Sequence, residues 1–238
     1  MSTYSLYQLN LAINGLANMS KAINFRIPRN KTAALQHIQN LVVRGYSSWT
    51  DGTILHTKLE RFVHKMDENY GVTENIQMRA RNRAKKSAST HLVIYPCDDT
   101  SYYWWLLVTA GRGNVHEMER LQDALSPVNR VKFGEQFELL YRQRTRVQGG
   151  GAGWTWRMQK TYYENWEYDL VRAVRSYNTK EVQNVINMLT RMPMFAGVRE
   201  QVYKLLRRGE RVWRRSGERT EVKWPGKLPY LQRIKIWS

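Results

Sequence analysis

The sequence predicts an α+β fold, in which a mostly antiparallel sheet with helices on one face is followed by a helical basic C-terminal module. The first observation is that apolar runs of strand length gather in the middle of the chain and come in pairs. The second is that the last third repeats apolar residues at every third or fourth position, which is typical of amphipathic helices. These patterns indicate an α+β domain over residues 1–160 and the helical module over 161–238.

The first elements precede the paired strands. Residues 24–28 form a short predicted strand that ends at a proline. The apolar spacing of 31–44 predicts an amphipathic helix. A turn at Asp51-Gly52 and a second amphipathic helix over 53–69 are expected next.

Two strand pairs fill the middle of the chain. The first pair covers 91–95 and 102–109, and the linker Pro-Cys-Asp-Asp-Thr-Ser between them suits a hairpin. The second pair covers 136–144 and 154–158. Its strands are joined by the glycine-rich segment 147–153, which we expect to be a flexible hairpin tip.

Helical periodicity covers most of the remaining chain. One short helix is expected between the two strand pairs, and three longer ones follow the second pair. The C-terminal residues hold three prolines or glycines and are expected to be an extended, packed tail. The predicted helices are 115–125, 162–175, 180–191 and 198–213, and the tail is 223–238.

The net charge of +18 is the strongest indication of function. The chain has 38 Lys+Arg against 20 Asp+Glu, and several of its nine Trp and 14 Tyr lie inside basic stretches. A surplus this large is relieved most simply by a polyanion. Cations contact phosphates and flat rings stack on exposed bases. The sequence therefore favours nucleic acid as the partner, single-stranded DNA or RNA before duplex.

Three basic elements are candidates for phosphate contact. A predicted loop over 79–90 carries five cations and no acid in its first eight residues. The hairpin around the glycine-rich tip combines arginines with tryptophans, and a helix of the last third has a basic side opposite its apolar side. The competing interpretation is that these tryptophans fill a core and the cations form a solvated face. The candidates are Arg79, Arg81, Arg83, Lys85 and Lys86 in the loop, Arg142, Arg144, Arg146, Trp154, Trp156 and Arg157 in the hairpin, and Arg207, Arg208, Arg211, Arg214 and Arg215 on the helix.

Residues suited to catalysis or metal binding are few. Asp98-Asp99 and the acids within 116–119 lie near strand ends, although an Asp pair is also an ordinary turn sequence. His56, Glu60 and His64 share one predicted helix, but i to i+8 spans about 12 Å, so the three cannot hold one ion. The sequence favours binding without catalysis and without a cofactor. A metal-dependent endonuclease or nicking enzyme is the first alternative, and a basic adaptor for an acidic protein is the second.

The composition also bears on compartment and partners. No stretch of about 18 apolar residues is present, and the N-terminus lacks a basic segment followed by an apolar one. Cys97 is the single cysteine, which fits a reducing compartment. We expect a cytoplasmic protein with no membrane partner, acting with other proteins of a nucleoprotein complex in replication, transfer or RNA processing.

Overall fold

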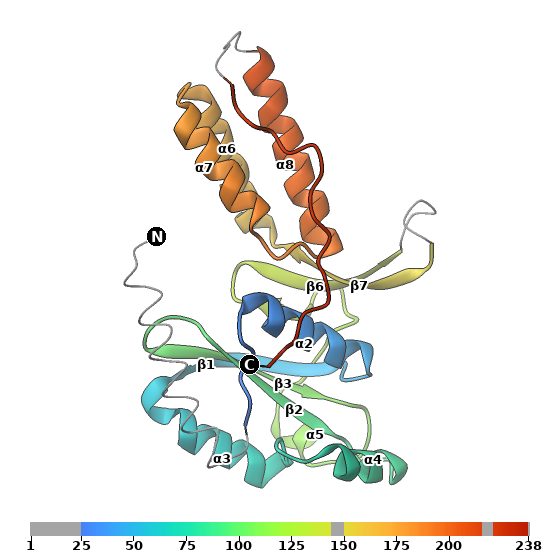
Figure 1. Ribbon diagram of the computed structural model, residues 1–238. Helices are drawn as coiled ribbons and strands as arrows, with labels where there is room; N and C mark the ends of the chain where they lie inside the picture. The colour runs from blue at the N-terminus through green and yellow to red at the C-terminus, as the bar shows by residue number, and fades with distance from the viewer. Residues whose placement is uncertain (1–24, 144–149, 216–220, 238) are drawn as a thin grey trace. The chain divides into compact units, whose positions relative to one another are not determined.

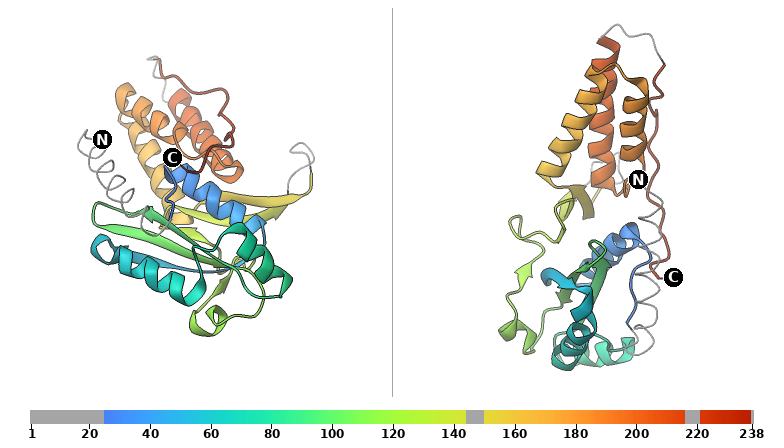
Figure 2. Two further views of the ribbon diagram at one scale, coloured as in Figure 1. Left: turned by 60° about the horizontal axis from the view of Figure 1, so that its bottom comes forward. Right: turned by 90° about the vertical axis from the view of Figure 1, so that its left-hand side faces the viewer.

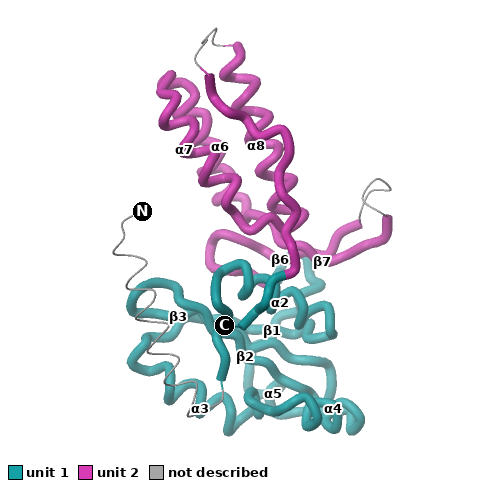
Figure 3. Tube along the Cα trace, viewed as in Figure 1, with its two compact units in different colours: residues 1–130, 234–238 teal, residues 131–233 magenta. Residues whose placement is uncertain are grey.

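The computed structural model describes residues 25–143, 150–215 and 221–237. Antiparallel sheets and helices confirm the α+β class and the helical C-terminal module. The chain divides into two compact units, residues 1–130 with 234–238 (unit 1) and residues 131–233 (unit 2) (Figure 3). The second predicted strand pair thus belongs to the unit of the C-terminal helices, whereas the sequence interpretation grouped it with the first strands.

Unit 1 is built on a four-stranded antiparallel sheet in the order β2-β3-β1-β4. The predicted hairpin of β2 and β3 is confirmed, with Thr90 opposite Val108 at one end of the ladder. The strands are β1 (Ser48–Leu55), β2 (Thr90–Pro96), β3 (Ser101–Val108) and β4 (Gln122–Asp123).

The expected turn at Asp51-Gly52 is wrong, because both residues lie within β1. Gly52 pairs with Trp104 of β3, and a Cβ on Gly52 would lie 2.8 Å from the Trp104 indole. The absence of a side chain at Gly52 therefore lets the Trp104 ring lie close to the β1 backbone. A glycine inside a strand often has this role, so an Asp-Gly pair need not form a turn.

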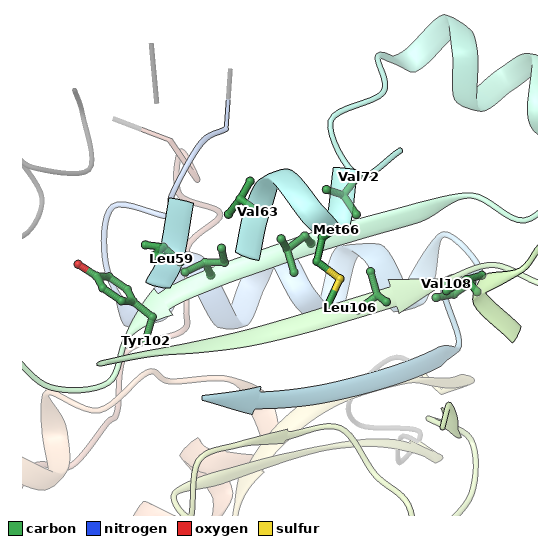
Figure 4. Packing of buried hydrophobic residues seen from close by; sticks show 10 residues of the cluster. Leu59, Val63, Met66, Val72, Tyr102, Leu106 and Val108 are labelled. Carbon is green, nitrogen blue, oxygen red and sulfur yellow. The ribbon is translucent and has the colours of Figure 1, made fainter. Parts of the chain in front are cut away.

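One face of this sheet packs on α3 (Leu59–Tyr70), which follows the short 3-10 helix η1 (His56–Lys58). The predicted helix over 53–69 thus begins later than expected, because β1 extends to Leu55. Alternating residues of β2 and β3 point toward α3, as a strand period of two requires. The cluster in Figure 4 contains Leu59, Val63, Met66, Val72, Leu92, Ile94, Tyr102, Leu106, Val108 and Val115.

A further helix, α2 (Lys31–Val43), packs against β2, and the His37 ring of α2 contacts His91 of that strand. Since His91 alternates with Leu92 of the α3-facing cluster, α2 covers the opposite face of the sheet. The helix begins at Asn30, whose Oδ1 accepts a hydrogen bond from the Ala33 N–H. Residues 25–28 form no strand, contrary to expectation.

The predicted loop over 79–90 is also wrong, because most of its cations lie on α4 (Ile76–Ala84). Asn75 caps this helix by accepting from the Met78 N–H, at 2.9 Å. Arg, Gln, Met and Ala are good helix formers, so composition alone supports the helix once a cap is in place. The predicted helix over 115–125 shortens to α5 (Val115–Met118), because β4 occupies part of that range.

Unit 2 combines the antiparallel sheet β5-β6-β7 with three helices, which lie side by side in Figures 1 and 2. The predicted helices of the last third are confirmed to within a few residues. The elements are β5 (Lys132–Phe133), β6 (Phe137–Gln143), β7 (Ala152–Met158), α6 (Lys160–Arg175), α7 (Thr179–Thr190) and α8 (Ala196–Arg215).

Helix α8 is fixed on β7 at its first turn. The Gly197 N–H donates to the Thr155 hydroxyl at 3.0 Å, and Gln201 exchanges two hydrogen bonds with the Met158 backbone. Residues 221–233 form neither helix nor strand and run beside α8 (Figure 2). There the Arg199 guanidinium stacks 3.8 Å from the centre of the Tyr230 ring.

Among the described residues, no helix is both long and apolar enough to cross a lipid bilayer.

We predict that Gly197→Ala lowers the free energy of unfolding by about 1–3 kcal/mol, the usual cost of overpacking. An added Cβ would lie 2.5 Å from the Trp156 carbonyl oxygen, so the backbones of α8 and β7 must separate. Urea unfolding measures the change. Gly226→Ala is the control, since nothing lies within 4 Å of its Cβ and a change below about 0.5 kcal/mol is expected. Equal stability of the two variants would contradict this packing.

Candidate nucleic-acid interface

Helix α8 presents one basic face. Its six exposed cations fall within about a third of the helix circumference at 100° per residue, over roughly 16 Å of axis. They are Lys204, Arg207, Arg208, Arg211, Arg214 and Arg215. Five of these were sequence candidates, and the structure brings all five to the same face.

The opposite arc of α8 is buried. Its side chains pack inside unit 2, so the helix has no apolar surface left on that side. The buried residues are Gly197, Val198, Val202, Leu205, Leu206, Gly209 and Trp213. The cations face outward because this arc fixes the rotation of the helix about its axis.

The cations of this face differ in their partners. Lys204 pairs with Glu200 at 2.9 Å, Arg208 with Glu167 at 2.6 Å, and Arg214 with Glu210 at 2.6 Å. Exposed ion pairs of this kind contribute about 0–1 kcal/mol each, so a phosphate can replace the carboxylate at small cost.

The remaining cations of α8 have no acidic partner among the described residues. Arg207 donates to the Tyr203 hydroxyl and lies 5.0 Å from the centre of its ring. Arg211 and Arg215 make no ion pair within the described ranges. The three residues follow one another at i, i+4 and i+8, so they form an unpaired row that runs obliquely along the basic face.

The hairpin contributes one cation beside α8. Arg142 of β6 donates to Glu200 at 2.7 Å, so Glu200 lies between Lys204 and Arg142. Hydrogen bonds from Lys204 and then Arg142 lower the pKa of the Glu200 carboxyl. Arg144 and Arg146, the other two arginines of this strand candidate, lie outside the described residues.

The tryptophans of β7 have separate roles. Trp154 and Trp156 share one face of the strand, opposite Tyr141 and Leu139 of β6. Trp156 is fully buried and belongs to the core, which corrects its assignment to base stacking. Trp154 is half-buried and makes an edge contact with the exposed Tyr141, at 5.4 Å between ring centres.

Arg157 is directed to the other face of β7. It pairs with Glu138 of the neighbouring strand at 2.5 Å, and this carboxylate is largely buried. The cation is therefore held by a cross-strand ion pair and is less available to a phosphate than the cations of α8.

A second group of exposed cations surrounds the C-terminal end of α4. We call Arg81, Arg83, Lys85, Lys86 and Arg112 the α4 patch. Because Arg81 and Arg83 lie on a helix rather than an extended loop, they point about 200° apart around its axis. None of the five makes an ion pair within the described part of the chain. Cations at a helix C-terminus are also favoured by the helix dipole.

Backbone hydrogen bonds hold Arg112 next to the C-terminal end of α4. The periodicity of the sequence does not predict this placement. The Arg112 N–H donates to the Lys86 carbonyl at 2.9 Å, and the Ala88 N–H donates to the Arg112 carbonyl at 2.8 Å. Gly111 has φ +137°, and a Cβ there would lie 2.7 Å from the Ser87 backbone. Only glycine fits this crossing.

Arg79 is not exposed with the other cations of this segment, contrary to the sequence interpretation. It is partly buried and donates to the Val72 carbonyl at 2.8 Å. Its guanidinium lines a pocket in unit 1 together with His37, His91 and Trp237. His37 and His91 are 54 residues apart in the sequence and form no local motif, so this pocket was not expected.

Burial keeps both histidines of this pocket neutral. Desolvation, followed by Arg44 and Arg79, lowers the pKa of His37 to about 4. Desolvation, followed by Arg79, His37 and Arg44, lowers the pKa of His91 to about 3. The rings lie 6.2 Å apart between their centres, and His91 also contacts the Tyr46 ring at 4.9 Å.

The candidate catalytic carboxylates have structural partners. Asp98 accepts hydrogen bonds from the backbone and hydroxyls of Thr100 and Ser101, which lower its pKa to about 2 and define a turn. Glu119 accepts from the Tyr70 hydroxyl at 2.6 Å. Burial, followed by this bond, raises the pKa of Tyr70 to about 12.

The two histidines of the helix segment considered for metal binding, His56 and His64, have different partners. His56 lies 3.1 Å from the Tyr102 hydroxyl, and His64 lies 3.3 Å from Glu68. Within the described ranges, no three His, Cys, Asp or Glu side chains gather closely enough to hold a metal ion.

Comparisons with protein families, with curated proteins and with solved structures find no match to this chain.

We predict that lowering the pH from 7 to 5 destabilises unit 1 through His37 and His91. Between about pH 6.5 and pH 4 the unfolded chain binds protons at these residues and the folded chain does not, so stability falls as pH falls. The expected loss is about 1–2 kcal/mol per histidine at pH 5. Urea unfolding at both pH values should show a flatter dependence for His91→Gln. Gly226→Ala, which changes no titratable group, should retain the wild-type dependence.

Proposed function

We propose that this protein binds nucleic acid, single strands in preference to duplex, through the basic face of α8. The observation that supports this proposal is the gathering of six exposed cations on one side of a helix whose other side is buried. Successive turns bring a cation to the same line about every 5.4 Å, which suits a polymer of negative charges rather than one small anion.

The charge of the whole chain supports a polyanionic partner. A net charge of +18 raises the local concentration of polyanions and speeds association. In the exposed ion pairs of α8, a phosphate can replace the carboxylate at a small cost in free energy. The unpaired row of Arg207, Arg211 and Arg215 makes the first phosphate contacts, and the paired cations of the same face follow.

Exposed tyrosines favour single strands over duplex. Tyr203 is 40% exposed beside Arg207 on α8, and Tyr230 is 76% exposed where it stacks on Arg199. Rings that lie next to cations can stack on unpaired bases while the cations hold the backbone. Duplex bases are stacked on one another and offer these rings little.

The α4 patch is a second surface of the same chemistry, and it lies in the other unit. Its five cations have no acidic partner within the described residues, so each is available for a phosphate. Two such surfaces suit a component of a replication, transfer or RNA-processing complex. The endonuclease and the adaptor for an acidic protein are the alternatives that the following assays distinguish.

The affinity for a single-stranded oligonucleotide should fall steeply with salt. If about five phosphates are neutralised, log K against log salt has a slope of roughly −3 to −4, at about −0.7 per phosphate. Fluorescence anisotropy measures it. Polyglutamate of equal charge serves as control, and binding it as tightly as the oligonucleotide would favour the acidic-protein adaptor. An intact oligonucleotide after incubation with Mg²⁺ argues against cleavage.

The triple variant Arg207→Gln, Arg211→Gln, Arg215→Gln should weaken binding and reduce the salt slope by about 2, because three phosphate contacts are lost. Lys58→Gln, Arg61→Gln, Lys65→Gln removes three charges from η1 and α3, where Glu60 and Glu68 lie on the same helix, and is the matched control. The control should retain most of the slope. Equal losses in both variants would show that net charge alone, and not the face of α8, determines binding.

A further inference from the structure

Unit 1 contains a pocket with a volume of about 630 Å³, within the usual range for small-molecule sites. Its walls come from α2, from the first half of α4, from β2 and from the C-terminal tail. Polar side chains in the lining include Arg79, His37, His91 and Glu74. Two flat rings, Phe25 and Trp237, also line it.

Arg79 brings a partly buried charge that makes no ion pair into this pocket. Its Nη2 donates to the Val72 carbonyl, while its Nε is buried and has no acceptor. No carboxylate within the described residues lies at ion-pair distance from the guanidinium. Glu74, which also lines the pocket, and Asp67 attract the guanidinium only from beyond that distance. A partly buried cation without a close anion is costly, and an anion in the pocket would lower that cost.

The two histidines add hydrogen-bond donors without adding charge. Because both rings are neutral near pH 7, each carries one N–H and one free nitrogen. Neither ring makes a hydrogen bond with another described residue. Together with the guanidinium fork, the two N–H groups supply donors from three side chains, which match the three terminal oxygens of a phosphate better than the two of a carboxylate.

The aromatic wall indicates what the anion is attached to. The Trp237 ring makes an edge contact with His37, at 4.8 Å between ring centres, and so lies next to the donor group. Phe25 is a second ring in the pocket lining. A planar ring attached to the anion can pack on this wall.

We propose that this pocket binds a nucleoside monophosphate, with the phosphate at Arg79, His37 and His91 and the base along Trp237. The site lies in unit 1 and uses none of the residues of α8. It therefore holds whether or not the protein binds a nucleic-acid strand.

Isothermal titration calorimetry of the full-length protein, freed of nucleic acid, tests the proposal with AMP, adenosine and inorganic phosphate at constant ionic strength. AMP should bind more tightly than adenosine or phosphate, because each fragment meets only one wall. Arg79→Gln should weaken AMP binding about tenfold or more, the effect of losing a charge-assisted hydrogen bond. Arg83→Gln, one turn further along α4 and exposed, is the control and should bind within about twofold of the wild type.

A stability measurement separates a binding role from a structural one. Without ligand, Arg79→Gln should keep or raise the Tm, because it removes an unpaired charge, whereas a purely structural Arg79 would lower it. If Arg79→Gln does not fold, His91→Phe keeps the ring and removes the donor, and should weaken AMP binding about fivefold. The proposal is overturned if neither AMP nor phosphate binds at millimolar concentration, or if both pocket variants bind AMP like the wild type.

Discussion

The cost of removing a cation from water determines how this chain, with 38 Lys+Arg, arranges its helices. On α8 the apolar arc that ends at Trp213 is buried, and Gly197 brings the helix backbone against β7. The cations then have only one side left, which faces solvent. A basic face is thus a consequence of how the opposite face packs, and its order comes from the helical period.

Acidic residues of unit 2 neutralise some of the cations of this face and leave others without an ion pair. Glu200 and Glu210 lie on α8 itself, and Glu167 reaches it from α6, so three cations of the face are paired. The oblique row, from Arg207 to Arg215 by steps of four, makes no ion pair within the described part of the chain. A row of cations without close carboxylates orients a polyanion along the helix, because the positive potential is strongest on that line.

Arg79 illustrates the cost of removing a cation from water, because its guanidinium is partly buried. Here a cation on α4 is partly removed from water, and the carboxylates of Glu74 and Asp67 act on it only from beyond ion-pair distance. Burial, and after it the charges of Arg79 and Arg44, lowers the pKa of His37 and of His91, so both rings stay neutral. On α8 the cations are stabilised by water. In the pocket of unit 1 we propose that an anionic ligand stabilises the cation.

The sequence by itself determined the fold class, the β2-β3 hairpin and the three C-terminal helices, because hydrophobic periodicity is local and follows the period of each element. It also placed Arg207, Arg208, Arg211, Arg214 and Arg215 on one helix face. Only the tertiary structure decided the rest. Gly52 lies in a strand because Trp104 pairs across it, and Trp156 is core because Leu139 faces it in a buried sheet. Arg79, His37 and His91 meet because α2, α4 and β2 pack together, and contacts between residues distant in sequence leave no periodic signal.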